Sequence, residues 1–316
     1  MTESSRPQPD VIEEGGQKVI FCSSEDMWFL PEASVDFFVT SPPYWHLKDY
    51  GCPGEIGQSP YDEYLLRLNV VWQQCYRLGK PDAVLVINVG NRRHKKRFYP
   101  IAFDITSAMQ GWRLWDILIW YIPNALPQPS HYIERLFDSK FEFLLVFTKE
   151  NSQNYKFHKP RVPQKYLVAD PRPYKKNARG RCLGNVIRVP AYRPPNVKDL
   201  GYHVSAYPEE IVALLLEAFT DPGDTVLDPF LGSGTTLKVA RVMNRKGIGV
   251  EINRGFEALI RQKIQERWGI PDWRDLDILH SSTMAVGMSK PRKIQWLRGP
   301  QSGPSLFDQG AFTLRE

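Results

Sequence analysis

The amino-acid sequence predicts an α/β fold built on a mostly parallel, twisted sheet. Two stretches support this prediction, because each is an apolar strand followed by a tight turn: VDFFVTSPPYW at 35–45 and TVLDPFLGSGTT at 225–236. In open α/β sheets, ligands bind where such strands end. The third observation is the composition of residues 151–200, which contain twelve Lys or Arg, two acids and seven prolines. So many prolines exclude regular helices and central strands, which predicts a small, loop-rich basic insert.

The composition is that of a globular protein with a polyanionic partner. The chain has 316 residues, of which 42% are hydrophobic, enough for one large domain with an insert or for two modest domains. The net charge is +6, whereas residues 151–200 alone carry +10. This asymmetry favours binding to nucleic acid and marks the insert as a separate surface.

Neither a disulfide framework nor a metal site is predicted. The four cysteines lie far apart, without a CxxC pair or a Cys/His spacing typical of zinc. The first ten residues lack the apolar core of a signal peptide, and no stretch approaches the ~18 apolar residues of a membrane span. We therefore expect a soluble cytoplasmic protein without membrane attachment.

The N-terminal part is predicted to alternate strands and helices. Residues 1–17 are polar and aperiodic, which predicts a flexible tail. Strands are expected at 18–22 and 35–39, the second covered on both faces. The glycine-punctuated loop that follows is long enough to meet a ligand. Ser59-Pro60 then starts a helix with an apolar stripe typical of a core-facing helix.

The next strand, at 83–89, ends in the basic run GNRRHKKR, which is either a solvated loop or a site for phosphates. A helix is expected at 99–110, and strands at 113–121 and 140–148 flank a proline-rich loop. Beyond the insert we expect helices at 208–219, 235–243 and 254–268, strands at 224–228 and 246–251, and a C-terminal tail from about 286.

The glycine-rich turn has features of a nucleoside site. Gly232 and Gly234 allow a ligand to approach the backbone, and the helix that follows offers free N–H groups. The turn is not a P-loop, because Thr235 follows the last glycine, nor a dinucleotide fingerprint, because Leu237 replaces the third glycine. Glu251 ends the next strand, where an acid binds ribose hydroxyls. These features predict a nucleoside ligand whose carboxylate, not a diphosphate, meets the turn.

TSPPYW and DPFLGSGTT together resemble the two principal motifs of the DNA amino-methyltransferases. The catalytic motif precedes the cofactor motif, as in the β class of that family, and the resemblance extends from about residue 18 to 268. Further similar segments are YDEYLLRLNVVWQQCYRL, DILIWYIPNALPQPS, RLFDSKFEFLLVFTK and GYHVSAYPEEIVALLLEAF. The resemblance implies a Rossmann-like methyltransferase fold with circularly permuted motif order, S-adenosylmethionine as cofactor, no metal, and double-stranded DNA as substrate.

The family also implies an organisation and a biological setting. We expect a prokaryotic or phage-encoded restriction-modification enzyme, monomeric or homodimeric, with a cognate restriction endonuclease as a candidate partner. The expected division of the chain is a flexible tail (1–17), a catalytic half (18–150), a target-recognition insert (151–200), a cofactor-binding half (201–285) and a C-terminal tail (286–316).

The resemblance assigns roles to particular residues. Ser41 Oγ and the Pro42 carbonyl would accept hydrogens from the target amine, while Tyr44 stacks on a flipped-out base; Trp45 either widens this platform or packs. The catalytic set is Ser41, Pro42, Pro43 and Tyr44. Cofactor contacts are expected from Ser23, Thr40, His203, Tyr207, Pro208, Asp228, Pro229, Phe230, Gly232, Ser233, Gly234, Thr235, Glu251 and Asn253. DNA contacts are expected from Arg92, Arg93, Lys95, Lys96, Arg97, Lys175, Lys176, Arg179 and Arg181.

The residue before Pro-Pro bears on the target base. Serine there resembles the N4-cytosine enzymes, whereas Asp or Asn is typical of N6-adenine enzymes, which stay the alternative. A C5-cytosine enzyme would need a cysteine after a proline, and none is present.

The chain also departs from the family pattern. Cys22-Ser23 stands where many members have Gly-Asp, so Ser23 or Asp26 would take over that cofactor contact. Because of this departure, a DNA-binding protein on an inactive methyltransferase scaffold stays an alternative. Methylation of RNA or protein is a third alternative.

Overall fold

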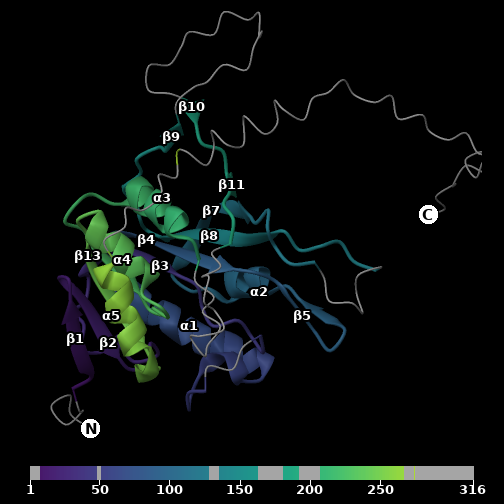
Figure 1. Ribbon diagram of the computed structural model, residues 1–316, viewed down its shortest axis with the longest axis horizontal. Coiled ribbons are helices and arrows are strands. Elements are labelled where there is room, and N and C mark those ends of the chain that lie inside the picture. The colour runs from purple at the N-terminus through teal and green to yellow at the C-terminus, as the bar shows by residue number, and fades with distance from the viewer. Residues whose placement is uncertain are drawn as a thin grey trace, which may run out of the picture.

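The computed structural model describes residues 8–47, 51–127, 135–162, 181–191, 207–266 and 274. Its centre is a mixed, mostly parallel sheet between two layers of helices (Figure 1). Across the sheet the strands are ordered β1 (Asp10–Glu14), β2 (Gln17–Phe21), β13 (Lys246–Glu251), β12 (Thr225–Asp228), β3 (Val35–Thr40), β4 (Gly79–Val89), β8 (Phe141–Lys149), β7 (Trp112–Tyr121) and β11 (Val186–Arg188). The predicted fold class is confirmed.

The strands from β2 through β13, β12 and β3 to β4 all run parallel. Their carboxyl ends therefore lie at one edge of the sheet, and the turns after β3 and β12 meet there although they are 188 positions apart in sequence. Strand β8 is antiparallel to both β4 and β7, and β11 is parallel to β7. The two predicted motifs are thus brought together by the topology.

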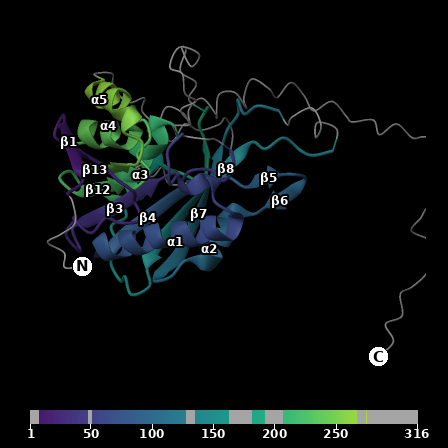
Figure 2. The ribbon, with the colours of Figure 1, turned by 90° about the horizontal axis from the view of Figure 1, so that it is seen from below.

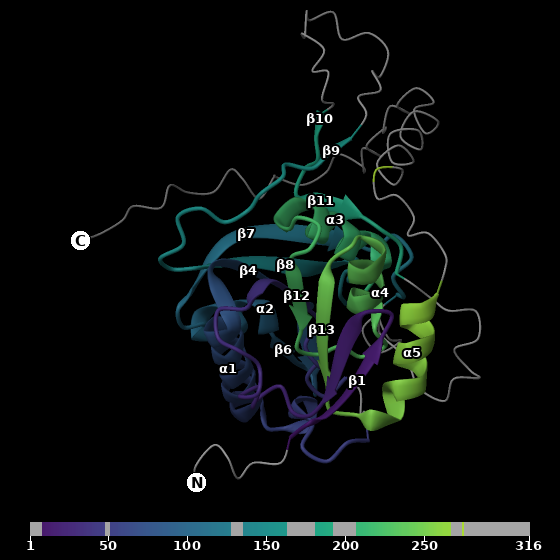
Figure 3. The same ribbon diagram turned by 90° about the vertical axis from the view of Figure 1, so that its left-hand side faces the viewer.

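Helices cover both faces of the sheet, as Figures 2 and 3 show. One face is covered by α1 (Tyr61–Leu78) and α2 (Ile101–Ala108), and the other by α3 (Glu209–Phe219), α4 (Thr235–Val242) and α5 (Glu257–Gln265). Alternate residues of β3 enter different cores: Phe38 lies in the cluster with α1, and Phe37 in the cluster with α3. Both side chains are fully buried, which confirms that this strand is covered on both faces. No described helix is long and apolar enough to cross a membrane.

The N-terminal segment corrects one expectation. The sequence predicts a flexible tail over residues 10–14, but they form β1 and pair antiparallel with β2. The connection is Gly15-Gly16, with φ of 54° and 74° at the two residues, the backbone that a two-residue hairpin turn requires. The chain is therefore part of the sheet from Asp10 onward.

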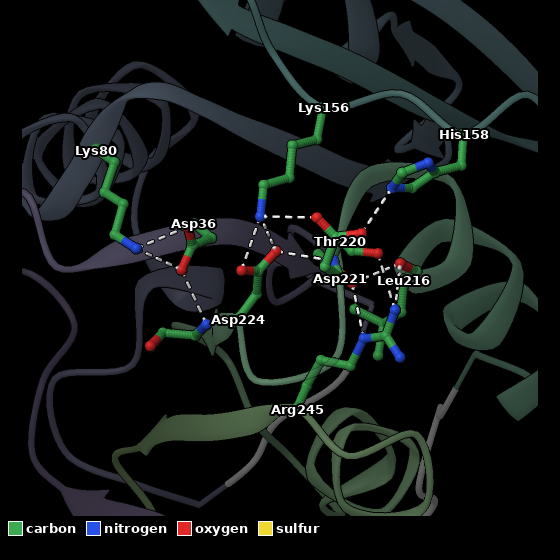
Figure 4. Close-up of polar contacts among 10 residues, drawn as sticks. Asp36, Lys80, Lys156, His158, Leu216, Thr220, Asp221, Asp224 and Arg245 are labelled. Atoms are coloured by element: carbon green, nitrogen blue, oxygen red, sulfur yellow. Dashed lines mark hydrogen bonds and ion pairs between the residues drawn. The ribbon is translucent and has the colours of Figure 1, made fainter.

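The basic insert is fastened to the body at both of its described ends. Its last part includes β11, which joins the main sheet, so residues 186–188 are not a separate module. Near its start, Lys156 pairs with Asp224 (2.6 Å) and Asp221 (3.1 Å), and His158 contacts Asp221 (2.9 Å) (Figure 4). Between these ends, β9 (Arg161–Val162) pairs with β10 (Arg181–Cys182).

The basic run after β4 is a hairpin, with β5 (Arg92–His94) antiparallel to β6 (Arg97–Tyr99). Two short 3₁₀ turns, η2 (Ile56–Gln58) and η3 (Arg254–Phe256), complete the described elements. Most of the insert and the expected C-terminal tail lie outside the described residues.

Candidate active site

A cavity opens at the sheet edge where β3, β12 and β13 end. It holds about 970 Å³ of space, including its opening to solvent. Ser41 and Pro43 of the first motif face the same space as the glycine turn of the second, so the cavity unites the two. The lining residues are Ser23, Ser24, Ser41, Pro43, Gly54, Glu55, Ile56, Tyr207, Pro229, Phe230, Leu231, Gly232, Ser233, Thr235, Val250, Glu251, Ile252 and Phe256.

Asp228 ends β12 but does not belong to the cavity lining; its side chain is buried. One carboxylate oxygen accepts hydrogen bonds from Thr40 Oγ1 (2.6 Å) and the Phe230 amide (3.0 Å). The other accepts from the Tyr207 hydroxyl (2.9 Å) and Thr236 Oγ1 (2.5 Å). Burial raises the pKa of Asp228, and these four donors oppose that rise. Asp228 therefore fixes the glycine turn by joining β3, α4 and the segment before α3.

Glu251 ends β13 and does line the cavity. Its carboxylate accepts hydrogen bonds from the amides of Gly232 and Asn253, both at 2.8 Å. The side chain is 8% exposed, and burial raises the pKa of Glu251 to about 7. Gly232 and Gly234 have φ of 55° and 92°, a backbone region that strongly favours glycine. The glycines therefore form the turn that brings the Gly232 N–H to Glu251.

The turn after β2 contains Cys22-Ser23, the pair that departs from the pattern of the family that the sequence resembles. Ser23 lines the cavity, and its hydroxyl donates to Glu25 (3.2 Å). The neighbouring Ser24 hydroxyl donates to the Pro229 carbonyl, which joins this turn to the glycine turn. Asp26, the other candidate for the missing contact, is exposed and outside the lining. Of these two candidates, Ser23 is the one that lines the cavity.

Arg67 on α1 organises the loop that follows the first motif. Its guanidinium donates to both carboxylate oxygens of Glu25 (2.9 and 2.5 Å). It also donates to the Gly54 carbonyl (2.7 Å) and to Ser59 Oγ (3.1 Å). Because Gly54 to Ile56 line the cavity, the loop that was expected to meet a ligand forms one of its walls.

The first motif presents two unused acceptors. In the part of the chain that the structure describes, neither Ser41 Oγ nor the Pro42 carbonyl oxygen forms a hydrogen bond. The Pro43 carbonyl, in contrast, accepts one from the Tyr64 hydroxyl (3.1 Å), which fixes the turn to α1. The turn is thus fixed to α1, while Ser41 lines the cavity and the buried Pro42 lies between two residues that line it.

The two aromatic residues of the motif differ in their surroundings. The Tyr44 hydroxyl donates to Glu142 (2.7 Å), and Asn88 Nδ2 donates to the same oxygen (3.0 Å). Burial raises the pKa of Glu142, and these two donors oppose that rise. Trp45 is 5% exposed and its Nε1 donates to the Ser59 carbonyl (2.9 Å). Trp45 therefore packs in the core and does not widen a base platform.

Other predicted residues lie behind the cavity or outside the described part of the chain. Thr40 is buried against Asp228, Pro208 directly precedes α3, and the Asn253 side chain caps η3 through the Gly255 amide. Gly234 precedes α4 and packs against Ile260. Four predicted site residues lie outside the part of the chain that the structure describes: His203, Lys175, Lys176 and Arg179. For Arg181, only its place in β10 is described.

Arg92, one of the predicted DNA contacts, is also bound to the protein backbone. Its guanidinium donates to the carbonyls of Trp45 (3.1 Å) and His46 (2.8 Å), and burial lowers its pKa. These two bonds fix the half-buried Arg92 to the backbone that follows the first motif. The outer residues Lys95, Lys96 and Arg97 are exposed.

Several residues of the site were missed from sequence. Ile252 directly follows Glu251, and its position after a strand-end acid was an available signal; Val250 and Phe256 lie close by in the chain. Arg67 lies within a helix, where nothing local distinguishes it from a surface charge. Glu142 belongs to the segment RLFDSKFEFLLVFTK, which the family resemblance singled out, but its contact with Tyr44 was not predicted. Among the described residues, no group of His, Cys, Asp and Glu is arranged to hold a metal ion.

Comparison with known proteins identifies the relatives of this chain. A family described as DNA methylase, of the N6/N4 type, matches residues 35–262. Type II methyltransferase M.XycI of Xanthomonas campestris pv. cyanopsidis is 30% identical over 268 residues, which cover 75% of this chain and 83% of that protein. Type II methyltransferase M.Cfr9I of Citrobacter freundii is 29% identical over 269 residues, with coverage of 75% and 83%.

Solved structures share the fold. The putative DNA modification methylase TTHA0409 of Thermus thermophilus, in complex with S-adenosyl-L-methionine, is 25% identical with a TM-score of 0.52, covering 77% of this chain and 91% of that one. The PvuII DNA methyltransferase (cytosine-N4-specific) has a TM-score of 0.60 at 19% identity, covering 87% and 97%. At that identity the second likeness concerns the fold alone.

Proposed function

Because this chain belongs to the family of N6/N4 DNA methylases, we propose that it transfers a methyl group from S-adenosylmethionine to the N4 amine of a cytosine flipped out of double-stranded DNA. The main support is the pair of unused acceptors, Ser41 Oγ and the Pro42 carbonyl, beside a cavity with nucleoside-binding features. Both acceptors lie on a turn that the rest of the structure holds rigid.

The cavity fits S-adenosylmethionine, which is also the ligand in the Thermus thermophilus complex. The cavity is open to solvent on one side and lined by both apolar and polar groups, as sites for small organic ligands usually are. Glu251 offers a carboxylate to ribose hydroxyls, and the apolar side chains of Ile252 and Phe256 suit an adenine ring. Ser233 and Thr235, beside the start of α4, would meet the carboxylate of the methionine part. The bound cofactor supplies a methyl group activated by its positive sulfonium.

The first motif would activate the target amine. The lone pair of an exocyclic amine is delocalised into the base, so the amine is a weak nucleophile. Ser41 Oγ and the Pro42 carbonyl would accept hydrogen bonds from its two N–H groups and favour a nitrogen with its lone pair directed at the methyl group. As the N–C bond forms, the S–C bond breaks, S-adenosylhomocysteine leaves, and the amine releases one proton to solvent. Because the prolines fix the turn, these acceptors need little reorganisation.

Tyr44 would hold the flipped base by stacking. Its hydroxyl bond to Glu142 orients the ring, and Asn88 orients Glu142 in turn. Flipping costs a few kcal/mol, which stacking on an oriented ring helps to offset. We therefore assign Glu142 and Asn88 as positioning residues.

The choice of cytosine over adenine rests on Ser41. The serine hydroxyl is short, whereas the Asp or Asn typical of the adenine enzymes extends one group further toward the amine. The alternative, N6-adenine methylation, keeps the same cofactor site and the same turn. Double-stranded DNA is the proposed substrate in either case, and a restriction endonuclease that cuts the same site is a proposed partner.

Transfer of a labelled methyl group tests this function. Unmethylated genomic DNA avoids the need to know the recognition sequence, and RNA and protein are the comparison substrates. We expect label in DNA alone, and a loss of rate on the order of 10² for Ser41→Ala, because one preorganised polar contact is removed. Cofactor affinity, measured by calorimetry, should change far less in this variant. Label in RNA or protein instead of DNA would refute the proposal.

The remaining alternative is a DNA-binding protein on an inactive scaffold, which the missing Gly-Asp pair favours. It predicts DNA binding without affinity for S-adenosylmethionine. Because Ser23 lies in the cavity lining where that pair is absent, we expect measurable cofactor binding in the same calorimetry.

A further inference from the structure

The segment Arg92–Tyr99, called the basic ribbon below, is a two-stranded hairpin with a two-residue turn. Its register pairs Arg92 with Tyr99, Arg93 with Phe98 and His94 with Arg97. The turn residues Lys95 and Lys96 have φ of 46° and 66°. Positive φ at both central residues is the geometry of a type I′ turn, whose twist matches that of the strands.

Lysine is a costly choice for this turn. Type I′ turns favour Asn-Gly, because a β-carbon crowds the backbone at positive φ; glycine lacks one, and the short polar side chain of asparagine can compensate by local hydrogen bonds. The ribbon nevertheless places two lysines at its tip, and backbone outliers of this kind cluster at functional sites. The two positive charges therefore need an explanation other than turn formation.

The outer half of the ribbon is exposed and positively charged. Lys95, Lys96, Arg97 and Phe98 are all exposed. Within the described ranges, no acid forms an ion pair with Lys95, Lys96 or Arg97. The Arg97 guanidinium lies over the Tyr99 ring, 5.1 Å from its centre, which extends the charge along the ribbon. This is the electrostatic footprint of a phosphate-binding surface.

The inner half of the ribbon is joined to the first motif. Arg92 donates to the carbonyls of Trp45 and His46, directly after the catalytic turn. The His94 ring stacks on His46 with centres 5.2 Å apart, and Tyr99 packs on Trp45 at 4.4 Å. The ribbon is thus a rigid extension of the turn that carries Ser41.

The position of the ribbon agrees with these contacts. It follows the carboxyl end of β4, the same sheet edge as the cavity, and it projects beyond the helices in Figures 1 and 2. The major groove of DNA, about 12 Å wide, admits a two-stranded ribbon.

We propose that the basic ribbon docks in a groove of duplex DNA and that Arg92 couples this docking to the catalytic turn. Lys95, Lys96 and Arg97 bind phosphates that border the groove. Arg92 binds no DNA but holds the turn, so that docking places the flipped base over Tyr44. The inference rests on the proposed function and adds the element that positions DNA.

Two variants distinguish the role of the ribbon tip, Lys95 and Lys96, from that of Arg92, which joins the ribbon to the first motif. Lys95→Asn/Lys96→Gly removes both charges and supplies the preferred type I′ residues, so it should fold at least as well as the wild type. We expect weaker binding to a duplex of mixed sequence, measured by fluorescence anisotropy, and a slope of log affinity against log salt that is smaller by about 2, one per lost phosphate contact. In methylation kinetics the loss should appear in KM for DNA.

Arg92→Lys keeps the charge but loses the two-carbonyl contact. It should show the opposite pattern, a lower kcat with an unchanged salt slope. The matched control is Arg113→Gln/Lys246→Gln, which removes two exposed charges at the amino edge of the sheet and should match the wild type.

The outcomes distinguish this inference from the proposed function. If wild-type protein neither binds nor methylates DNA, the proposed function fails. If the wild type is active but Lys95→Asn/Lys96→Gly keeps the wild-type salt slope, only the ribbon inference is wrong. The inference would also be overturned if the Arg113→Gln/Lys246→Gln control lowered the salt slope as much as Lys95→Asn/Lys96→Gly does. The loss of any two positive charges, wherever they lie, would then explain the effect.

Discussion

Glu251 shows how the surroundings of one residue set its chemistry. Two backbone amides hold its carboxylate, and no cation compensates its charge among the described contacts. Burial is the dominant influence and raises its pKa to about 7. The unfolded chain has the ordinary value near 4.5. Between these values the folded protein binds a proton that the unfolded chain releases, so Glu251 lowers stability as pH rises through this range.

The pH dependence of cofactor binding follows from the same shift. Ribose hydroxyls donate to the charged form of Glu251, so affinity for S-adenosylmethionine should rise with pH. Linkage predicts roughly tenfold tighter binding at pH 8 than at pH 6 if the bound carboxylate stays ionised. Glu251→Gln should bind more weakly and lose most of this dependence. Equal pH profiles for both proteins, by calorimetry, would show that Glu251 does not meet the ribose.

Individual site residues were predictable where their chemistry is local. Ser41 and Gly232 belong to turns whose residues are consecutive in sequence, and both line the cavity. Glu142 was not predictable as a support for Tyr44, because 98 positions separate the two residues. The burial of Trp45 likewise depends on the Ser59 carbonyl and on packing that only the folded chain provides.

At the scale of elements, a buried charge cluster joins the three helices α3, α4 and α5 behind the glycine turn. Lys238 on α4, only 3% exposed, lies between Glu209 of α3 (2.9 Å) and Glu266 after α5 (2.7 Å). Lys263 of α5 contacts the same two acids at 2.6 and 3.3 Å. Although burial acts to raise it, hydrogen bonds from the two lysines hold the pKa of Glu209 below its ordinary value. The cluster therefore stabilises the fold at pH values above the ordinary carboxylate pKa. This contribution is lost as the pH falls through the lowered pKa of Glu209.

Lys238→Met tests the contribution of this cluster. Removal of one partner leaves two partly buried carboxylates with a single lysine, so the free energy of unfolding should fall by about 2 kcal/mol at neutral pH. Lys246→Met, at an exposed strand start, is the control and should stay within about 0.5 kcal/mol of the wild type. Equal stability of Lys238→Met and wild type in urea titrations would mean that packing alone joins these helices.

Elements were predictable where periodicity is strong. The stripe of α1 and the apolar runs of β4, β7 and β8 were identified within a few residues. Strand β1 was missed because three of its five residues are acids and Val11 and Ile12 do not alternate with them, although the Gly15-Gly16 pair is a hairpin signal. Strand β11 has only three residues and exists through pairing with the distant β7, so no local pattern identifies it.

At the scale of the molecule, the two edges of the sheet have different tasks. The carboxyl edge carries the cavity and the basic ribbon. The amino edge carries structural contacts: Lys80 binds Asp36 (2.8 Å), Asp36 accepts from the Thr225 amide (3.0 Å), and Lys156 binds Asp224 (Figure 4). The Lys156 contact fixes the start of the insert at this edge of the sheet, opposite the edge that carries the cavity.

This arrangement was only partly predictable from the sequence. The shared edge of the two motifs follows from parallel strands, which the apolar runs indicated. The charge asymmetry indicated a basic insert, but its attachment depends on contacts between Lys156 and residues 65 or more positions away. Local composition does not determine such contacts.

The identity of the methylated base tests the central claim most directly. Unmethylated genomic DNA would be incubated with the protein and S-adenosylmethionine, digested to nucleosides and separated by chromatography with mass detection. Ser41 before Pro-Pro predicts N4-methylcytosine, formed by the wild type and strongly reduced in Ser41→Ala. N6-methyladenine as the sole product would contradict the assignment of cytosine, and the absence of any methylated base would contradict the proposed function as a whole.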